Sequence, residues 1–213
     1  MKKIMMTLAA VAVAATMNAQ GYIGGSLGFS SAKSNNGAVG VAATSETTTT
    51  GFSIAPEIGY KLDDKMSVGI ALGFGSLKNK VEAVGAAATP GATTSVETTT
   101  TTFELKPYLR YQVLTFGKAN IFVDGGLDFG MATAKDYKPA MNIGLFVTPG
   151  IAFDVNEKWS IVAKLDNMFS LGYAKAAVPD VDGAPDPATS FNVGLSSGGF
   201  NVGSLSFGVY YNF

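Results

Sequence analysis

The chain has 213 residues, 15% of them charged, and a formal net charge of -1, so a clustered basic surface for nucleic acid is not predicted. It has neither cysteine nor histidine, which excludes disulfides, thiolate or imidazole metal ligands, thiol nucleophiles and a Ser-His-Asp relay. We expect no catalytic site, no metal site and no cofactor. Because the chain beyond its amino terminus has no run of 18 apolar residues, a helical membrane protein is not favoured.

The amino terminus has the layout of a secretory signal. Lys2 and Lys3 form the basic part, residues 4–16 the apolar part and residues 18–20 the exit, with cleavage expected after Ala19. A membrane-anchoring helix is disfavoured because the apolar part is shorter than the ~20 residues that a span requires. The predicted division is a signal peptide over residues 1–19 and one exported domain over residues 20–213.

From residue 22 onward, apolar and small polar residues alternate with a period of two, which predicts strands with one apolar face. In chain order, strands are predicted over residues 22–30, 49–61, 66–76, 101–112, 120–131, 143–154, 159–173 and about 202–213. Short turns at residues 62–65, 115–118 and 156–158 alternate with long loops at residues 32–48, 77–98, 132–141 and 174–188. Residues 191–200 are not assigned to a strand. This order describes an up-and-down antiparallel meander.

Three prolines occupy matching places in the even-numbered strands. Pro56, Pro107 and Pro149 are each followed by an aliphatic residue two positions later and an aromatic residue four positions later, which makes a weak internal repeat. Because proline cannot donate to a ladder, we expect a bulge or bend at each of the three positions.

Aromatic residues on the apolar parity gather at two levels. Near the loop end are Phe29, Phe52, Phe74, Phe103, Phe129 and Tyr173, and near the turn end are Tyr60, Tyr111, Phe153, Trp159, Tyr211 and Phe213. Two such girdles are typical of a barrel in a membrane, where an open sheet edge would leave backbone groups unpaired. We therefore predict an all-β fold, an eight-stranded antiparallel up-and-down transmembrane β-barrel. A soluble lipocalin-like barrel is disfavoured because it would point its apolar residues inward.

The last strand carries the resemblance to a known family. Phe207, Val209, Tyr211 and the terminal Phe213 alternate with small or polar residues, and this ending resembles the strand by which outer-membrane barrels are recognised for insertion. Over nearly its full exported length the chain resembles the small OmpA- and OmpX-type barrels of the porin-like outer-membrane family. The resemblance implies the outer membrane of a Gram-negative cell, contact with its lipid, and recognition of the last strand by the barrel-assembly machinery. Enzymes of this architecture rely on histidine, which this chain lacks.

The opposite parity supplies the expected barrel interior. Its predicted polar network consists of Glu57, Glu104, Lys106, Arg110, Asp124, Asp128, Lys164 and Asp166. Arg110 and Lys106 are expected to pair with the acidic residues of strands two, four and five, and Lys164 with Asp166, because a buried charge is costly unless it is paired. The network is interpreted as a polar core; a narrow conductive path through the same groups is the alternative.

The loops are the expected place of function. Threonine runs at residues 47–50 and 98–102 lead into strands, so strands two to four are predicted to project beyond the lipid with residues 78–84 as the rising partner. A projecting edge could capture extended segments by strand addition; solvated, low-complexity loops are the alternative. The predicted role is structural or a cell-surface interaction with a protein or glycan ligand, and a narrow porin-like channel for small solutes or ions is the alternative.

Overall fold

The computed structural model describes residues 20–37, 44–84, 93–165, 168–181, 183–195 and 205–213, which form twelve strands. Within these ranges, no helix has the length and apolar character to cross a membrane. The strands are β1 (Gly21–Gly37), β2 (Thr44–Lys61), β3 (Met66–Val84), β4 (Thr93–Phe116), β5 (Ala119–Ala134), β6 (Tyr137–Lys138), β7 (Ala140–Asp154), β8 (Trp159–Leu165), β9 (Phe169–Lys175), β10 (Val178–Pro179), β11 (Thr189–Leu195) and β12 (Leu205–Asn212).

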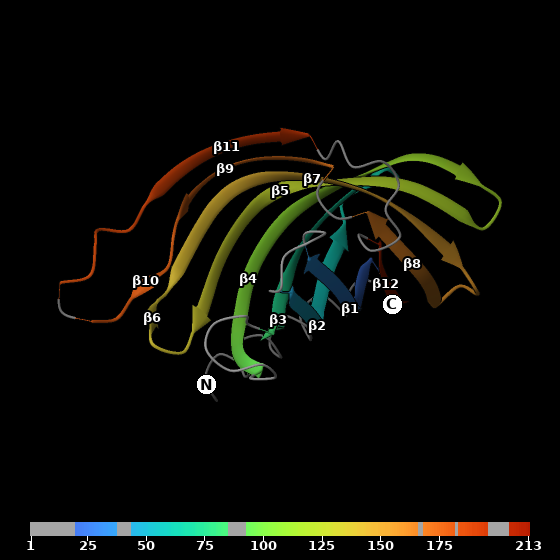
Figure 1. The fold of residues 1–213 in the computed structure, drawn as a ribbon. Helices are drawn as coiled ribbons and strands as arrows, with labels where there is room; N and C mark the ends of the chain where they lie inside the picture. Colours follow the sequence, from blue (N-terminus) through green and yellow to red (C-terminus); the bar gives the residue numbers. More distant parts are fainter. Residues whose placement is uncertain (1–19, 38–43, 85–92, 166–167, 182, 196–204) are drawn as a thin grey trace, which may run out of the picture.

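Eight of these strands close into a ring. β1, β2, β3, β4, β5 and β7 each pair with the next in antiparallel fashion, and β7 pairs with β8, β8 with β12, and β12 with β1 (Figure 1). The predicted eight-stranded antiparallel up-and-down barrel is therefore confirmed. β6 and β10 form a separate two-stranded sheet.

The seventh predicted strand is divided in two, and an additional strand precedes the last one. β7 pairs through residues 141–147 with β9 and through residues 150–154 with β8. β11, in a region that was not assigned to a strand from the sequence, pairs with β9, while β12 pairs with β8. The predicted strand over residues 159–173 thus occurs as β8 and β9, and the last described strand begins at Leu205; the predicted start near residue 202 lies outside the described residues.

The ladders are interrupted at the three prolines. The β2–β3 ladder omits Pro56, and the β4–β5 ladder omits Pro107, each time together with the preceding residue and without a change of register. Pro149 lies where the partner of β7 changes from β9 to β8. If the register of the β7–β9 ladder continued, Gly150 would lie opposite position 166, but it pairs with Lys164, two residues earlier. The missing proline N–H accounts for the interruptions. A further irregularity of the β4–β5 ladder, between residues 112 and 114, was not predicted.

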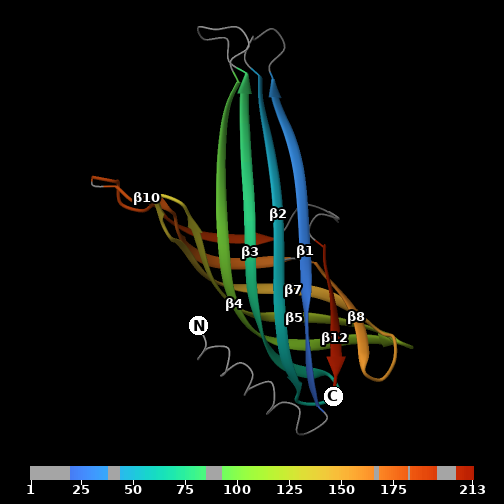
Figure 2. The same ribbon diagram turned by 90° about the horizontal axis from the view of Figure 1, so that it is seen from below.

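The first four strands are longer than predicted. β1 pairs with β2 out to Gly37 and Thr44, and β3 pairs with β4 out to Val84 and Thr93. The described parts of the long loops expected at residues 32–48 and 77–98 are therefore strand, as the predicted extension of strands two to four requires and the alternative of solvated loops does not. Figure 2 shows β1 to β4 running together past the rest of the barrel.

We call the outer parts of these four strands the projecting sheet. It begins at the row in which Ser30, Gly51, Leu77 and Thr100 lie side by side and continues to the tips of the strands. β5 ends beside the base of this sheet, with Ala134 opposite Thr100.

The barrel is apolar outside and polar inside. Large apolar residues on the odd-numbered positions of β5 are among the exposed side chains, as Leu127 at 42% shows, whereas Phe122 and Asp124 on the even-numbered positions are each 2% exposed. The small buried core of Tyr22, Phe122, Val162 and Tyr210 therefore lies within the lumen. This arrangement is the inverse of a soluble protein and matches a barrel whose outer solvent is lipid.

Candidate functional site

A cluster of ionised and phenolic side chains fills the lumen toward the turn end of the barrel. Arg110, the only arginine in the sequence, is 9% exposed. Its Nε donates to Asp124 Oδ1 at 2.7 Å, and its Nη2 donates to Asp124 Oδ2 at 2.8 Å. This two-point contact requires the planar fork of a guanidinium, which lysine cannot supply.

Glu57 is the centre of the same cluster and is 4% exposed. Its Oε1 accepts from Tyr108, from Arg110 Nη2 at 3.0 Å and from the Tyr210 hydroxyl at 2.9 Å. Its Oε2 accepts from Lys164 Nζ at 2.7 Å, and Lys164 also lies 3.1 Å from Asp124 Oδ2. Both buried carboxylates are thus paired with two cations and hydrogen-bonded on each oxygen, the condition under which buried charges are tolerated.

We call these four charged residues, together with Tyr22, Tyr108, Phe122 and Tyr210, the luminal plug. The Tyr22 hydroxyl lies 2.7 Å from that of Tyr108, and the Arg110 guanidinium carbon lies 4.0 Å from the centre of the Phe122 ring. The two positive and two negative charges cancel, and the aromatic rings enclose them. The plug therefore fills this part of the lumen with a neutral, fully hydrogen-bonded core.

The remaining members of the predicted network lie elsewhere. Lys106 pairs with Glu104 at 2.8 Å, nearer the loop end, and its Nζ lies 5.9 Å from the centre of the Phe146 ring. Asp128 is partly buried on β5, and its Oδ1 is buried without a hydrogen-bond partner among the described residues. Asp166, the predicted partner of Lys164, lies outside the described residues, and the observed partners of Lys164 are Glu57 and Asp124.

Sequence reasoning did not include the aromatic members of the plug. Tyr22, Tyr108 and Phe122 share the interior parity of their strands, but the predicted network contains charged groups only. A signal was present in the sequence, because glycines stand opposite two of the rings: a Cβ on Gly59 would collide with Tyr22, and one on Gly69 with Tyr108. Glycine within a strand often marks a close approach, and here the approaching group is the ring on the neighbouring strand.

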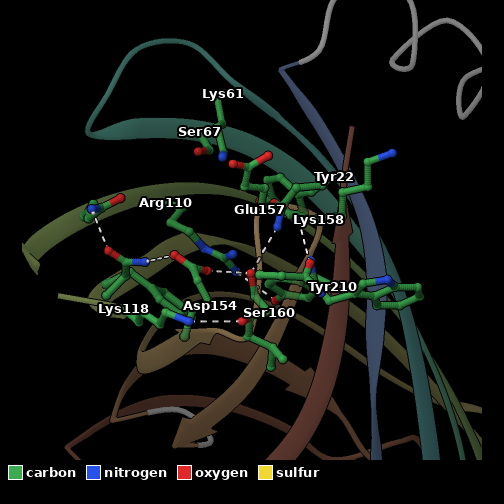
Figure 3. A pocket seen from close by; sticks show the side chains of 18 of the residues that line it. Tyr22, Lys61, Ser67, Arg110, Lys118, Asp154, Glu157, Lys158, Ser160 and Tyr210 are labelled. Atoms are coloured by element: carbon green, nitrogen blue, oxygen red, sulfur yellow. Dashed lines mark hydrogen bonds between the residues drawn. The ribbon is translucent and has the colours of Figure 1, made fainter. Parts of the chain in front are cut away.

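A cavity of about 920 Å³ opens below the plug at the turn end (Figure 3). Its inner end is formed by Tyr22, Arg110, Phe122 and Tyr210 of the plug. Along its wall, hydrogen bonds of 2.6–3.1 Å form one continuous chain that runs from Gln112 through Asn120, Asp154 and Ser160 to Asn212. The cavity is therefore a polar vestibule that ends at the plug.

Above the plug, the lumen wall is made of small residues. One row across β1 to β4 reads Gly28, Ser53, Gly75 and Thr102, and a second hollow of about 310 Å³ lies against it. A Cβ on Gly28 would collide with the Ser53 hydroxyl, and one on Gly75 with that of Thr102. Alternation of glycine and hydroxyl thus gives this part of the lumen a thin wall, in contrast to the filled part below.

The projecting sheet has two different faces. The face that continues the lipid-facing side carries charges in pairs: Lys33 with Glu46 and Lys78 with Glu97 at 2.8 Å, and Lys80 with Glu82 at 2.5 Å. The face that continues the lumen wall is uncharged and includes Val81 beside Val96, and Thr49 Oγ1 donating to Asn79 Oδ1 at 2.7 Å. Lys80 lowers the pKa of the Glu82 carboxyl by hydrogen bonding and charge, and Glu82 raises the pKa of Lys80.

The predicted girdle residues lie on the outer surface of the barrel. Those among the exposed large side chains are Phe29, Phe52, Phe74, Phe103, Phe129, Tyr173, Tyr111, Phe153, Trp159 and Phe213, whereas Tyr60 and Tyr211 are of intermediate exposure. Tyr60 donates to Gln20 Oε1 at 2.6 Å. In the last strand, Phe207 and Val209 are exposed, and the Tyr211 ring lies 5.0 Å from that of Trp159 and 5.2 Å from that of Phe213. These contacts place the terminal aromatic beside the turn-end girdle.

Comparison with known proteins agrees with this architecture. Among solved structures, the chain is similar to outer membrane protein OprG from Pseudomonas aeruginosa, at 13% identity and a TM-score of 0.50, over 91% of this chain and 96% of that one. It is also similar to Neisserial surface protein A, at 14% identity and a TM-score of 0.46, over 91% of this chain and 97% of that one. No curated protein matches the sequence.

The model of the family described as outer membrane protein beta-barrel domain matches residues 4–213, nearly the whole chain. The match confirms the resemblance drawn from the last strand and the alternating pattern, and it accounts for the apolar outer surface as the side in contact with membrane lipid. The chain belongs to the outer membrane protein β-barrel domain family and is a protein of the Gram-negative outer membrane.

Proposed function

We propose that the protein is a sealed barrel that displays the projecting sheet at the cell surface for interaction with other macromolecules. In this proposal residues 1–19 are removed as an export signal, and the last strand is the segment that the barrel-assembly machinery recognises. The single observation that carries the proposal is the luminal plug. Glu57, Arg110 and Asp124 are each at most 9% exposed and are paired with one another, which supports a lumen closed to solvent at that level.

The plug argues against the alternative of a narrow channel. A conducting ion would have to separate Arg110 from two carboxylates and leave buried charges unpaired, at a cost of about 3–5 kcal/mol for a broken buried pair. An eight-stranded barrel is in any case only wide enough for its own side chains. The lumen is therefore better suited to holding the strands together than to passing solutes.

Planar-bilayer recordings test the sealed barrel. The natural protein is expected to give no reproducible openings, whereas the double variant Arg110→Gly with Glu57→Gly removes the centre of the plug and is expected to conduct. Reproducible openings of the natural protein, with an ion selectivity that Arg110→Gln alters, would favour the channel. The double variant must first show the heat-dependent gel mobility of a folded barrel.

The display function is tested by shortening the projecting sheet. Residues 32–49 and 79–98 are each replaced by an Asn-Gly turn, since Ala32 pairs with Thr49 and Asn79 with Thr98, so the barrel register is kept. Cells that carry the shortened protein are expected to insert it normally but to lose attachment to surfaces coated with extracellular protein or glycan. Equal attachment by both proteins would contradict the proposal.

A further inference from the structure

The outermost part of β4 is a sheet edge without the usual protection. Residues 93–99 pair with β3 on one side, while the pairing with β5 begins only at Thr100, and no other described strand pairs with them. We call residues 93–99 the β4 edge; it is about 23 Å long at ~3.3 Å per residue. An edge of this length presents unpaired N–H and C=O groups and is a template for pairing with another chain.

Natural proteins protect such edges with lysine, proline or a bulge. The β4 edge has none of these, because its sequence is Thr-Thr-Ser-Val-Glu-Thr-Thr and its register against β3 is unbroken. Its only charge, Glu97, is neutralised by Lys78 on the neighbouring strand at 2.8 Å. Ser95, Val96 and Glu97 are all exposed, Val96 at 58%. Among the described residues, the edge is therefore unpaired by any further strand and free of repulsive groups.

The sequence of the β4 edge is nearly symmetric about Val96. If two copies pair antiparallel about this residue, Val96 meets Val96, and Ser95 meets Glu97 twice. Each Ser95 hydroxyl can then donate to a Glu97 carboxylate, and no like charges lie directly opposite one another. A two-fold interface requires this kind of self-complementarity. We propose that the β4 edge pairs with the same edge of a second copy of this chain; the inference rests on the proposed display function.

The geometry further indicates that the second copy stands in a facing membrane. Two upright barrels in one membrane would have to pair these edges in parallel, and the continuing β4 of one copy would then occupy the position of β5 beside Thr100 of the other. An inverted copy avoids this overlap, because its β4 continues away from the first barrel. In Figure 2 the projecting part of β4 stands clear of β5 and β7, which turn to one side.

The pairing is tested by disulfide trapping between two sets of vesicles. The natural chain has no cysteine, so Val96→Cys carries a single thiol. Opposite residues of an antiparallel pair have Cα atoms about 4.5–5.5 Å apart, within the range of a disulfide. Val81→Cys is the matched control, because Val81 lies directly opposite Val96 on the same face but within the sheet. Each variant is placed in phosphatidylethanolamine–phosphatidylglycerol vesicles, in a tagged and an untagged form, and the two sets are mixed.

We expect vesicle clustering and a cross-linked tagged–untagged dimer for Val96→Cys, and at least a tenfold lower yield for Val81→Cys. Val96→Lys should abolish clustering by placing a charge on the edge, whereas Thr47→Lys, in the same row two strands away, should cluster like the natural protein. Equal cross-linking of both cysteine variants, cross-linking only within one vesicle, or no clustering would overturn the second-copy proposal. The attachment assay with the shortened sheet tests the display function separately, because it measures binding to extracellular protein or glycan and not to a second copy of this chain.

Discussion

Replacing Arg110 by methionine tests whether the luminal plug holds the barrel together. Arg110 donates to Asp124 at 2.7 and 2.8 Å, to Glu57 at 3.0 Å and to the Tyr210 hydroxyl at 3.0 Å. Methionine retains much of the volume but leaves two carboxylates, 4% and 2% exposed, with Lys164 as their one cation in the described plug. One uncompensated buried charge is expected to lower the free energy of unfolding by about 3–5 kcal/mol.

The measurement is urea unfolding of the protein in lipid vesicles, followed by the fluorescence of Trp159, the only tryptophan. The control is the double variant Arg110→Met with Asp124→Leu, which removes one charge of each sign and leaves the Glu57–Lys164 pair of 2.7 Å intact. It should be more stable than Arg110→Met alone. A loss below about 1 kcal/mol for the single variant, as for an exposed ion pair, would refute the reasoning. A double variant whose loss equals the sum of the two single losses would refute the coupling.

Three further changes test other parts of the molecule. Gly59→Ala places a Cβ against the ring of Tyr22 and should cost about 1–3 kcal/mol in the same urea assay; an unchanged midpoint would show that the ring moves aside. Deleting Phe213 should reduce the folded fraction in isolated outer membranes on a heat-modifiability gel, and normal assembly would count against its role as a recognition signal. Lys80→Met should raise the pKa of Glu82 toward its ordinary value in an NMR titration, because Lys80 lowers that pKa in the natural protein. The stabilisation from this pair should therefore weaken as pH falls through the carboxyl pKa. An unchanged pKa in the variant would show that the pair does not form in solution.

The period-two alternation was sufficient to predict which side chains face outward. On β5 it separates exposed Leu127 from buried Phe122 and Asp124, because successive residues of a strand must point to opposite faces. The same alternation cannot give the register between distant strands. That Glu57 contacts Lys164, 107 positions later, depends on how far the sheet is sheared when it closes.

The ends of the strands were less predictable. Residues 77–84 include lysine, asparagine, glutamate and alanine, which are depleted in strands, and their pairing with residues 93–100 comes from register continued out of the barrel. The division of the seventh strand follows from the change of register across Pro149, which a single-strand pattern does not contain. Pro149 indicates where the pairing is interrupted, but it does not indicate by how many residues the register changes.

The plug takes its side chains from β1, β2, β4, β5, β8 and β12, including the first and last strands of the ring. All of these groups come together only after the first and last strands of the meander have paired. A half-rolled intermediate would keep Asp124 beside Arg110 on the neighbouring strand but would leave Glu57 without Lys164, so its passage into hydrocarbon would be opposed until joining was complete. Circularisation of the sheet and its entry into the bilayer are thereby coupled, and the chain is expected to enter its membrane as one all-or-none unit rather than hairpin by hairpin.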